Sequence, residues 1–283
     1  MARLSKNIRK VRIFYREDNR AALAWKAKIE AWLKRRYPKV KIVNKGYQAL
    51  IVLGGDGTIL EAARECLHTN AVVVGLNLGT VGFLASARRP PEFLPTLEKF
   101  FKGRYELMDR NVMKLTVVRK KKKVFSTTAL NELVVMNPLG MVKVQTHVNG
   151  HEFQSIAGTG VMVATSTGST AYNISAHGPV VMPTSRSFIL TEILDHNIPT
   201  PSLVLSDEHK IELSVQSFRK RELLSVTATG QKVDVLFIAD GEILFPLHAK
   251  DSVLIERAPF TVKFAEFEKN YFLKSLQKKF AFK

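Results

Sequence analysis

Hydrophobic and polar positions follow two different periods in the first hundred residues of the chain. Residues 10–15 alternate every second position, as a half-buried strand does, whereas residues 20–36 carry apolar side chains at helical spacing up to the stop at Pro38. Strands that alternate with helices are typical of an open parallel sheet with helices on its faces. The remaining patterns of this part predict strands at 40–43, 49–53 and 71–75, a helix beginning near residue 58, and a helix at 93–101.

From about Tyr105 the pattern changes to short strands at close spacing. Asn149-Gly150 stands between two such runs and favours a type I′ hairpin turn. We therefore predict an all-β part of two packed sheets, similar to a β-sandwich. Its predicted strands lie at 114–118, 124–135, 142–148, 151–153, 203–205, 210–215, 223–227, 233–238 and 252–257.

The predicted architecture is thus α/β plus all-β, with boundaries set by these changes of pattern. We expect an open parallel-sheet domain at 1–104 and a β-rich domain at 105–262. Helical spacing returns at 267–280, so the segment 263–283 is expected to pack back on the first domain, with a frayed tail as the alternative.

The apolar run that ends at Leu53 is followed by Gly54-Gly55-Asp56-Gly57-Thr58. A strand end, a glycine turn and a helix N-terminus together form an anion site, and we expect Thr58 and Glu61 to cap that helix as a capping box. A carboxylate in a phosphate site repels the phosphate unless it binds a cation or takes a proton. Asp56 therefore indicates phosphoryl transfer, with a tight turn and a solvent-facing Asp as the alternative.

A second glycine-rich stretch, 75–84, follows the next predicted strand. Because the carboxyl ends of parallel strands meet at one edge of a sheet, we expect the two glycine loops to lie together. Phe83 is expected either to cover this region or to fill the core.

The β-rich part contains two further polar anomalies. A strand runs into the small hydroxyl residues of 165–175, which offer hydrogen-bond donors and acceptors without bulk and suit an adenine or a ribose. Asn131 and Glu132 interrupt an otherwise apolar strand, and a sugar diol with a base edge would satisfy both. The alternative for each is a structural hydrogen-bond network. With the phosphate loop, these features predict that both domains bind a nucleotide.

Composition narrows the functional classes further. The net charge of +18 is concentrated in runs such as 119–123 and 219–221, which lie between predicted strands, so solvated hairpin tips account for them and no nucleic-acid surface is expected. The single cysteine, Cys66, suits a reducing cytosol and a core position. The N-terminus has no apolar run behind its charges, and glycines and Asn77 interrupt the longest apolar stretch. We therefore expect a cytoplasmic protein without a signal peptide or membrane span.

Gly-Gly-Asp-Gly-Thr at 54–58, Leu-Asn-Glu at 130–132 and Thr-Gly-Ser-Thr-Ala-Tyr at 167–172 resemble, in this order, the motifs of the NAD kinase family. The resemblance covers nearly the whole chain, although lipid kinases and phosphofructokinases share the first motif. It implies phosphorylation of the adenosine 2′-hydroxyl of NAD by ATP or polyphosphate, a divalent metal such as Mg²⁺ carried mainly by the nucleotide phosphates, and a homodimer or homotetramer.

The resemblance also implies roles for single residues. Asp56 would be the general base and Gly54, Gly55, Gly57 and Thr58 would shape the phosphate loop, while Asn131 and Glu132 would hold the adenine and its ribose. The other residues implied to bind substrate are Phe83, Thr159, Thr167, Thr170, Ala171, Tyr172, Ser175 and Glu242.

The chain departs from the family pattern at several positions, among them the stretch 192–196, which reads Glu-Ile-Leu-Asp-His where the family has Pro-Ile-Cys-Pro-His. Ala157 and Thr159 stand where the family usually has Arg and Asp, and Glu242 replaces a frequent Gln. Because Ala157 and Thr159 belong to the part of the site that holds the far half of the dinucleotide, we expect weaker binding of NAD. Two alternatives stay open, a related kinase acting on a lipid or another nucleotide, and a non-catalytic nucleotide-binding relative.

Overall fold

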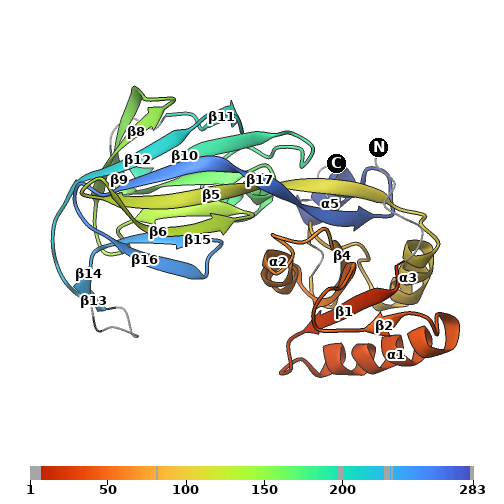
Figure 1. Cartoon of the computed structure of the whole chain (residues 1–283). Coiled ribbons are helices and arrows are strands. Elements are labelled where there is room, and N and C mark those ends of the chain that lie inside the picture. The colour runs from red at the N-terminus through yellow and green to blue at the C-terminus, as the bar shows by residue number, and fades with distance from the viewer. Residues whose placement is uncertain (1–7, 81, 197–199, 226–229, 231, 281–283) are drawn as a thin grey trace. The chain divides into compact units, whose positions relative to one another are not determined.

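The computed structural model describes residues 8–80, 82–196, 200–225, 230 and 232–280, and the chain divides into two compact units (Figure 1). Unit 1 comprises residues 1–110 and 260–283, and unit 2 comprises residues 111–259. The α/β and strand-rich classes predicted from the sequence are confirmed. No helix in the described part of the chain is both long and apolar enough to cross a membrane.

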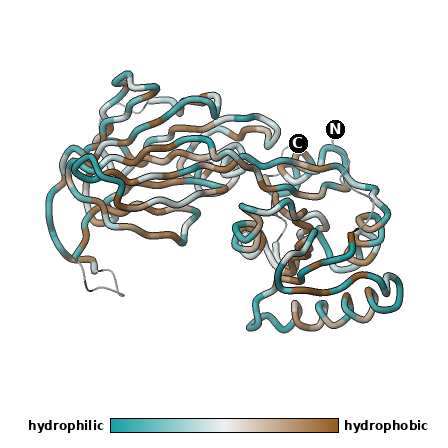
Figure 2. Tube along the Cα trace, in the orientation of Figure 1, coloured by the Kyte–Doolittle hydropathy of each residue, from teal (hydrophilic) through white to brown (hydrophobic). Residues whose placement is uncertain are grey.

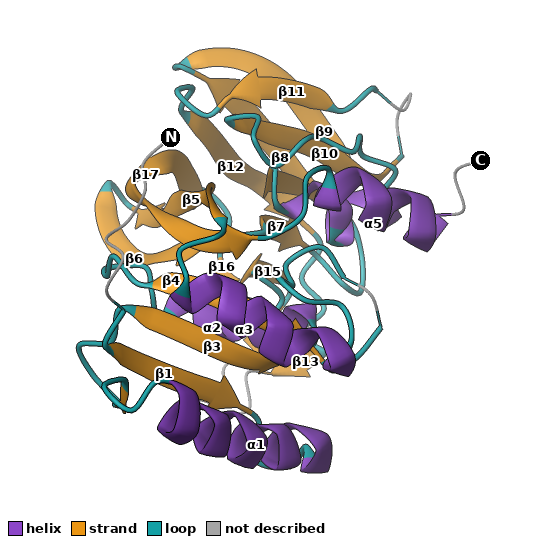
Figure 3. Cartoon of the chain, turned by 90° about the vertical axis from the view of Figure 1, so that its right-hand side faces the viewer, coloured by secondary structure: helices purple, strands orange, loops and turns teal. Residues whose placement is uncertain are grey.

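Unit 1 is a parallel sheet with helices packed on it (Figure 3). Its strands pair in the order β2, β1, β3, β4 and the end of β17, all parallel. The elements are β1 (Lys10–Tyr15), α1 (Arg20–Arg36), β2 (Lys41–Ile42), β3 (Ala49–Gly54), α2 (Asp56–Arg64), β4 (Val72–Asn77), the 3₁₀ turn η1 (Pro90–Glu92), α3 (Phe93–Phe101) and α5 (Tyr271–Phe280).

Local signals explain the ends of α1. The side chain of Asn19 accepts a hydrogen bond from the backbone N–H of Ala22 at 3.1 Å and so caps the first turn. Three basic residues in the last turn suit the negative end of the helix dipole. Alternate residues of β3 lie in one core with α1 and α3, which fixes the sheet face that these helices cover.

Unit 2 is built almost entirely of antiparallel strands around one large hydrophobic core. The prediction of two sheets needs a correction, because hydrogen bonds join most of its strands into a single sheet. The first half of β9 pairs with β8, and its second half lies between β7 and β10. Only the short β13–β14 pair forms a separate sheet among the described residues.

The strands of unit 2 and their lengths are as follows. Those of the first half are β5 (Glu106–Arg119), which begins in unit 1, β6 (Lys122–Ala129), β7 (Glu132–Met136), β8 (Val142–Val148) and β9 (His151–Thr165). After the short helices η2 (Gly168–Thr170) and α4 (Tyr172–Ser175) come β10 (Ser187–Asp195), β11 (Leu203–Ser206), β12 (Ile211–Phe218), β13 (Leu224–Ser225), β14 (Lys232–Val233), β15 (Val235–Ala239), β16 (Ile243–Leu247) and β17 (Ser252–Glu266), which ends in unit 1.

Two turns of unit 2 carry the polar residues expected of hairpin tips. Asn149 and Gly150 both have positive φ, 53° and 81°, which confirms the predicted turn. Lys120 and Lys121 form the tip between β5 and β6, also at positive φ. Hydrophilic residues mark such turns, whereas hydrophobic residues follow the strands (Figure 2).

Candidate functional site

The two glycine-rich loops of unit 1 leave the same edge of its sheet. β3 and β4 are parallel neighbours, and their last residues, Gly54 and Asn77, are register partners. Beyond the strands, the N–H of Leu78 donates to the carbonyl of Gly54 at 3.3 Å. The structure thus brings the loop that carries Asp56 beside the loop that follows β4, as the strand order predicts.

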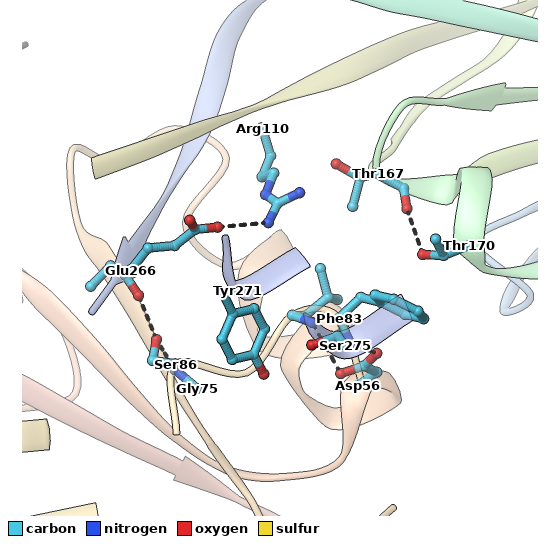
Figure 4. A network of polar contacts seen from close by, with 12 residues as sticks. Asp56, Gly75, Phe83, Ser86, Arg110, Thr167, Thr170, Glu266, Tyr271 and Ser275 are labelled. Atoms are coloured by element: carbon cyan, nitrogen blue, oxygen red, sulfur yellow. Dashed lines mark hydrogen bonds and ion pairs between the residues drawn. The ribbon is translucent and has the colours of Figure 1, made fainter. Parts of the chain in front are cut away.

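Asp56 is held by the backbone of the second loop. Its carboxylate accepts hydrogen bonds from the N–H of Phe83 at 2.7 Å and from the N–H of Leu84 at 3.2 Å (Figure 4). A Cβ atom at Gly82 would lie 2.1 Å from a carboxylate oxygen of Asp56. Glycine is therefore required at position 82 for this carboxylate to reach its two donors.

The predicted capping box of Thr58 and Glu61 is wrong. α2 begins at Asp56, two residues earlier than expected, and its N-cap residue Gly55 offers no side chain to the first amides. Glu61 instead pairs with Arg16, with 2.9 Å between the charged atoms. The helix N-terminus is thereby left without a side-chain cap, which suits an external anion.

The glycines of this turn have different surroundings. A Cβ atom at Gly54 would lie 2.5 Å from Thr58, so Gly54 allows the close approach of that side chain. At Gly55 and Gly57 a Cβ atom would meet nothing within 4 Å. These two glycines therefore keep the backbone accessible to a ligand, because no neighbouring side chain occupies the space in front of them.

Phe83 fills core in this structure. Its side chain is buried in a small hydrophobic cluster with Phe272 and Leu276 of α5. Its backbone N–H is the part that faces Asp56.

Two residues of unit 1 near Asp56 escaped the sequence analysis. Arg110 is buried, forms an ion pair with Glu266 at 3.3 Å, and has an Nε atom without a partner. Burial lowers the pKa of Arg110, while the charges of Glu266 and Asp56 act to raise it. Tyr271 is also buried, with a hydroxyl group that lacks a partner, and burial raises its pKa. The polar run 109–111, which interrupts the apolar pattern of β5, is the feature of the sequence that could have identified Arg110.

In unit 2 the Asn131-Glu132 segment is organised by Asp240. The carboxylate of Asp240, in the turn between β15 and β16, accepts from the N–H groups of Leu130, Asn131 and Glu132 at 3.0, 2.7 and 3.2 Å. These three amides therefore leave the strand ladder, and the predicted strand 124–135 is split into β6 and β7. The resemblance to the NAD kinase family includes the Asp240-Gly241 turn, but it gave Asp240 no role, and its partners lie more than a hundred residues away in the sequence.

Glu132 is a buried carboxyl group with an oxygen, Oε2, that has no hydrogen-bond partner. Burial raises the pKa of Glu132 to about 8, and the charge of Asp240 adds to the increase, whereas the backbone of Tyr172 opposes it. The group is therefore mostly protonated at neutral pH in the free protein. A buried, unpaired acceptor is costly unless a ligand satisfies it.

The hydroxyl-rich segment packs directly on Asn131-Glu132. Thr165 donates through its hydroxyl to the carbonyl of Leu130 at 2.6 Å and through its N–H to the carbonyl of Asn131 at 2.8 Å. A Cβ atom at Gly168 would lie 2.1 Å from the same Asn131 carbonyl oxygen. The glycine at 168 therefore allows the two motifs to meet.

The other residues predicted in this segment differ in exposure. The Thr167 hydroxyl is buried without a partner, and the carbonyl of Thr167 accepts from the Thr170 hydroxyl at 3.5 Å (Figure 4). Ala171 is half-buried, while Tyr172 and Ser175 of α4 are exposed. The segment thus offers one orphaned hydroxyl and an exposed aromatic ring near Glu132.

Thr159 lies away from Glu132 along the same sheet. Ala164 is the register partner of Glu132, and Thr159 lies five positions earlier on β9, roughly 17 Å away along an extended strand. Glu242 is exposed, two residues beyond Asp240 in the same turn. The described residues contain no cluster of three or more His, Cys, Asp or Glu side chains arranged to hold a metal ion.

Comparison with known proteins covers both units. Residues 11–105 match the ATP-NAD kinase N-terminal domain and residues 130–267 match the ATP-NAD kinase C-terminal domain. An NAD kinase from Lachnoclostridium phytofermentans is 31% identical over 89% of this chain and 86% of its own length. An NAD kinase from Lachnospira eligens is 29% identical over 96% of this chain and 94% of its own length.

Solved structures show the same fold. A crystal structure of an NAD kinase from Archaeoglobus fulgidus in complex with ATP is 27% identical, with a TM-score of 0.73 over 96% of this chain and 97% of that chain. A crystal structure of yeast NADH kinase complexed with NADH is 19% identical and has a TM-score of 0.85 over 97% of this chain and 88% of that chain.

Proposed function

The chain belongs to the NAD kinase family, and we propose that it is a kinase that phosphorylates the adenosine 2′-hydroxyl of NAD with ATP to give NADP and ADP. One observation carries the proposal beyond family membership. The lone carboxylate of Asp56 stands at an uncapped helix N-terminus, fixed by two backbone amides. A base beside a phosphate-binding turn is what phosphoryl transfer to an alcohol needs.

Asp56 is the proposed general base. Its carboxylate takes the proton from the 2′-hydroxyl as that oxygen forms a bond to the γ-phosphorus and the bond from the γ-phosphorus to ADP breaks. The accessible amides at Gly55 and Gly57 and the N-terminus of α2 hold the phosphates of the donor. Thr58 shapes this turn through its contact with Gly54.

Glu132 and Asn131 are the proposed nucleotide-binding residues. The unpartnered carboxyl oxygen of Glu132 gives a ribose diol an acceptor that the protein itself leaves unused. The orphaned hydroxyl of Thr167 supplies a further donor or acceptor for the base or sugar. The other proposed contacts come from Thr170, Ala171, Tyr172 and Ser175.

A divalent metal such as Mg²⁺ fits the residues present if the nucleotide phosphates carry most of its ligands. Asp56 is partly exposed and stands alone rather than in a carboxylate cluster of the described residues, which suits one protein ligand at most. When bound, the ion would neutralise charge on the phosphates.

Further properties that follow from the family are also proposals. We expect a homodimer or homotetramer that works in the cytoplasm, with ATP or inorganic polyphosphate as donor. Ala157 and Thr159 lack the charges usual in the family, so weaker binding of NAD stays a prediction.

The test is the direct assay. Purified protein is incubated with NAD, Mg²⁺ and either ATP or polyphosphate, and NADP is measured with an NADP-specific dehydrogenase. The matched control is Asp56→Asn, which keeps the size of the side chain and one of its two acceptor oxygens. Formation of NADP by the parent alone supports the proposal. NAD that binds without any turnover would favour a non-catalytic relative, and phosphorylation of a lipid or another nucleotide instead of NAD would overturn it.

A further inference from the structure

The helix α5 packs against the residue that fixes Asp56. The ring of Phe83 lies 5.6 Å from that of Phe272, centroid to centroid, and 6.3 Å from that of Phe280, with which it is stacked. Leu276, one turn after Phe272, belongs to the same buried cluster, and the ammonium group of Lys279 lies 5.0 Å from the centroid of the Phe83 ring. α5 therefore covers the Phe83 side chain along most of its length.

The backbone of the same residue points the other way. The N–H of Phe83 makes the shorter of the two hydrogen bonds to the Asp56 carboxylate, 2.7 Å against 3.2 Å from Leu84. Because the side chain and the amide belong to one residue, a rotation or shift of the Phe83 ring moves the donor. Phe83 thus links the Asp56 carboxylate, through its amide, to the packing contacts of its ring on α5.

α5 also holds the far end of the loop. Arg88 donates from Nη2 to the carbonyl of Tyr271 at 3.2 Å and to the hydroxyl of Ser275 at 3.4 Å. Its guanidinium carbon lies 4.4 Å from the centroid of the Tyr271 ring, within the range of a cation–π contact. The carbonyl of Arg88 accepts in turn from the side chain of Asn77 at 3.2 Å. Because Asn77 is the last residue of β4, this bond ties the end of the loop to the end of the strand.

We propose that α5 is a positioning element for the phosphoryl-transfer reaction, in which Phe272 and Leu276 hold Phe83 so that its amide orients the Asp56 carboxylate. The proposal rests on the assignment of Asp56 as the base. Phe272 and Leu276 act only through Phe83, so they are positioning residues rather than catalytic ones. A displaced base costs turnover steeply, since a shift of about 1 Å can lower a rate roughly a hundredfold.

The first experiment separates turnover from binding. Phe272→Ala removes the ring against Phe83, and Leu273→Ala, on an exposed position of the same helix, is the matched control. We expect Phe272→Ala to lower kcat roughly tenfold or more while the KM values for ATP and NAD stay within about threefold. Leu273→Ala should equal the parent, and Phe272→Leu should recover most of the loss because it refills the cluster. Thermal unfolding of each variant checks that the assay temperature lies well below its midpoint.

The second experiment does not depend on activity. Amide hydrogen exchange, resolved to Phe83 and Leu84, reports directly on the two hydrogen bonds to Asp56. Phe272→Ala should speed exchange at these two amides at least tenfold, with no comparable change in β3, and Leu273→Ala should leave it unchanged.

The outcomes are distinct. If the parent forms no NADP, the proposed function fails, yet slower exchange in the parent than in Phe272→Ala still supports the link from α5 to the loop. If the parent is active and Phe272→Ala retains its kcat and its protection, the positioning role is overturned. A loss confined to KM, or faster exchange throughout unit 1, would equally overturn it and leave Phe272 a residue of general stability.

Discussion

The two carboxyl groups of the proposed site, one in each unit, lie in opposite kinds of surroundings. Asp56 is partly exposed, and backbone amides from a neighbouring loop fix both of its oxygens. Glu132 is buried, one of its oxygens has no partner, and its pKa is raised to about 8. The first environment fixes the direction of a carboxylate, whereas the second controls whether the group carries a proton. The contrast is consistent with the proposed roles, a positioned base in unit 1 and a binding group in unit 2.

The largest effect is expected at Asp56. Asp56→Asn should lower kcat by about 10² or more because a positioned base is lost, while NAD binding should stay within a few-fold. Steady-state kinetics and calorimetric titration with NAD measure the two quantities separately. Near-normal turnover of Asp56→Asn would show that Asp56 is not the base. The proposed difference in role between Asp56 and Glu132 would then fail.

Gly82→Ala tests whether the direction of the Asp56 carboxylate matters. The new methyl group would stand 2.1 Å from an Asp56 oxygen, so the carboxylate must turn away from its donors. We expect kcat to fall roughly tenfold to a hundredfold. Gly79→Ala is the control in the same loop, since a Cβ atom there would have its nearest neighbours at 3.8 Å. Equal kinetics of the two variants would contradict the prediction.

Glu132→Gln tests the binding role. The substitution keeps the shape but removes the ability to ionise, and we expect NAD affinity to fall about tenfold with a smaller change of kcat. In the parent, affinity should rise with pH up to about 8 and then level off, because an ionised Glu132 accepts from the ribose diol and binding must first remove its proton. Affinity of the Gln variant should lack this dependence. An effect on turnover alone would show that the role is misassigned.

The same substitution has a consequence for stability. A carboxyl pKa that rises on folding stabilises the native state at pH values below the unfolded pKa near 4.5, and this contribution is lost as the pH rises to about 8. The free energy of unfolding of the parent should therefore fall across this window relative to Glu132→Gln, by about 1.4 kcal/mol per pH unit at most. Urea unfolding at several pH values measures the difference.

The smallest effect is expected for Asp240→Asn, which sharpens the account of Glu132. Loss of the Asp240 charge removes the second cause of the raised pKa of Glu132. The pKa of Glu132, measured as the midpoint of the pH dependence of NAD affinity, should therefore move below 8, while burial keeps it above the ordinary value. One of the three amides that Asp240 binds loses its acceptor, at a cost of about 1 kcal/mol in stability. An unchanged midpoint would leave burial as the sole cause.

Sequence reasoning succeeded where the signals are local. The ends of β1, α1, α3 and β8 coincide with their predicted ranges, because periodicity and nearby cap and stop residues determine them. The glycine turn at Asp56 and the second glycine loop were likewise readable from short stretches. Their proximity followed from the rule for parallel strands alone.

The failures have long-range causes. β16 contains Pro246 and lies at the edge of the sheet, where proline is tolerated, so its pattern did not resemble a strand. β9 was predicted as two separate strands, one at 151–153 and one leading into the hydroxyl-rich segment, because its continuity depends on pairing with different strands along its length. Asp240, Arg110 and Tyr271 have their partners on distant segments, so the local pattern around each residue did not identify these contacts.

The chain order of unit 1 has a consequence for biosynthesis. Its α5 is translated only after the whole of unit 2, although the Asp56 loop that α5 packs against lies in the first third of the sequence. Since nascent domains fold as they leave the ribosome, β1 to β4 are synthesised and exposed before the last helix of their unit has been translated. With α5 as a positioning element, a chain released early would keep its glycine turn but lack the support of its base, and so would turn over little ATP.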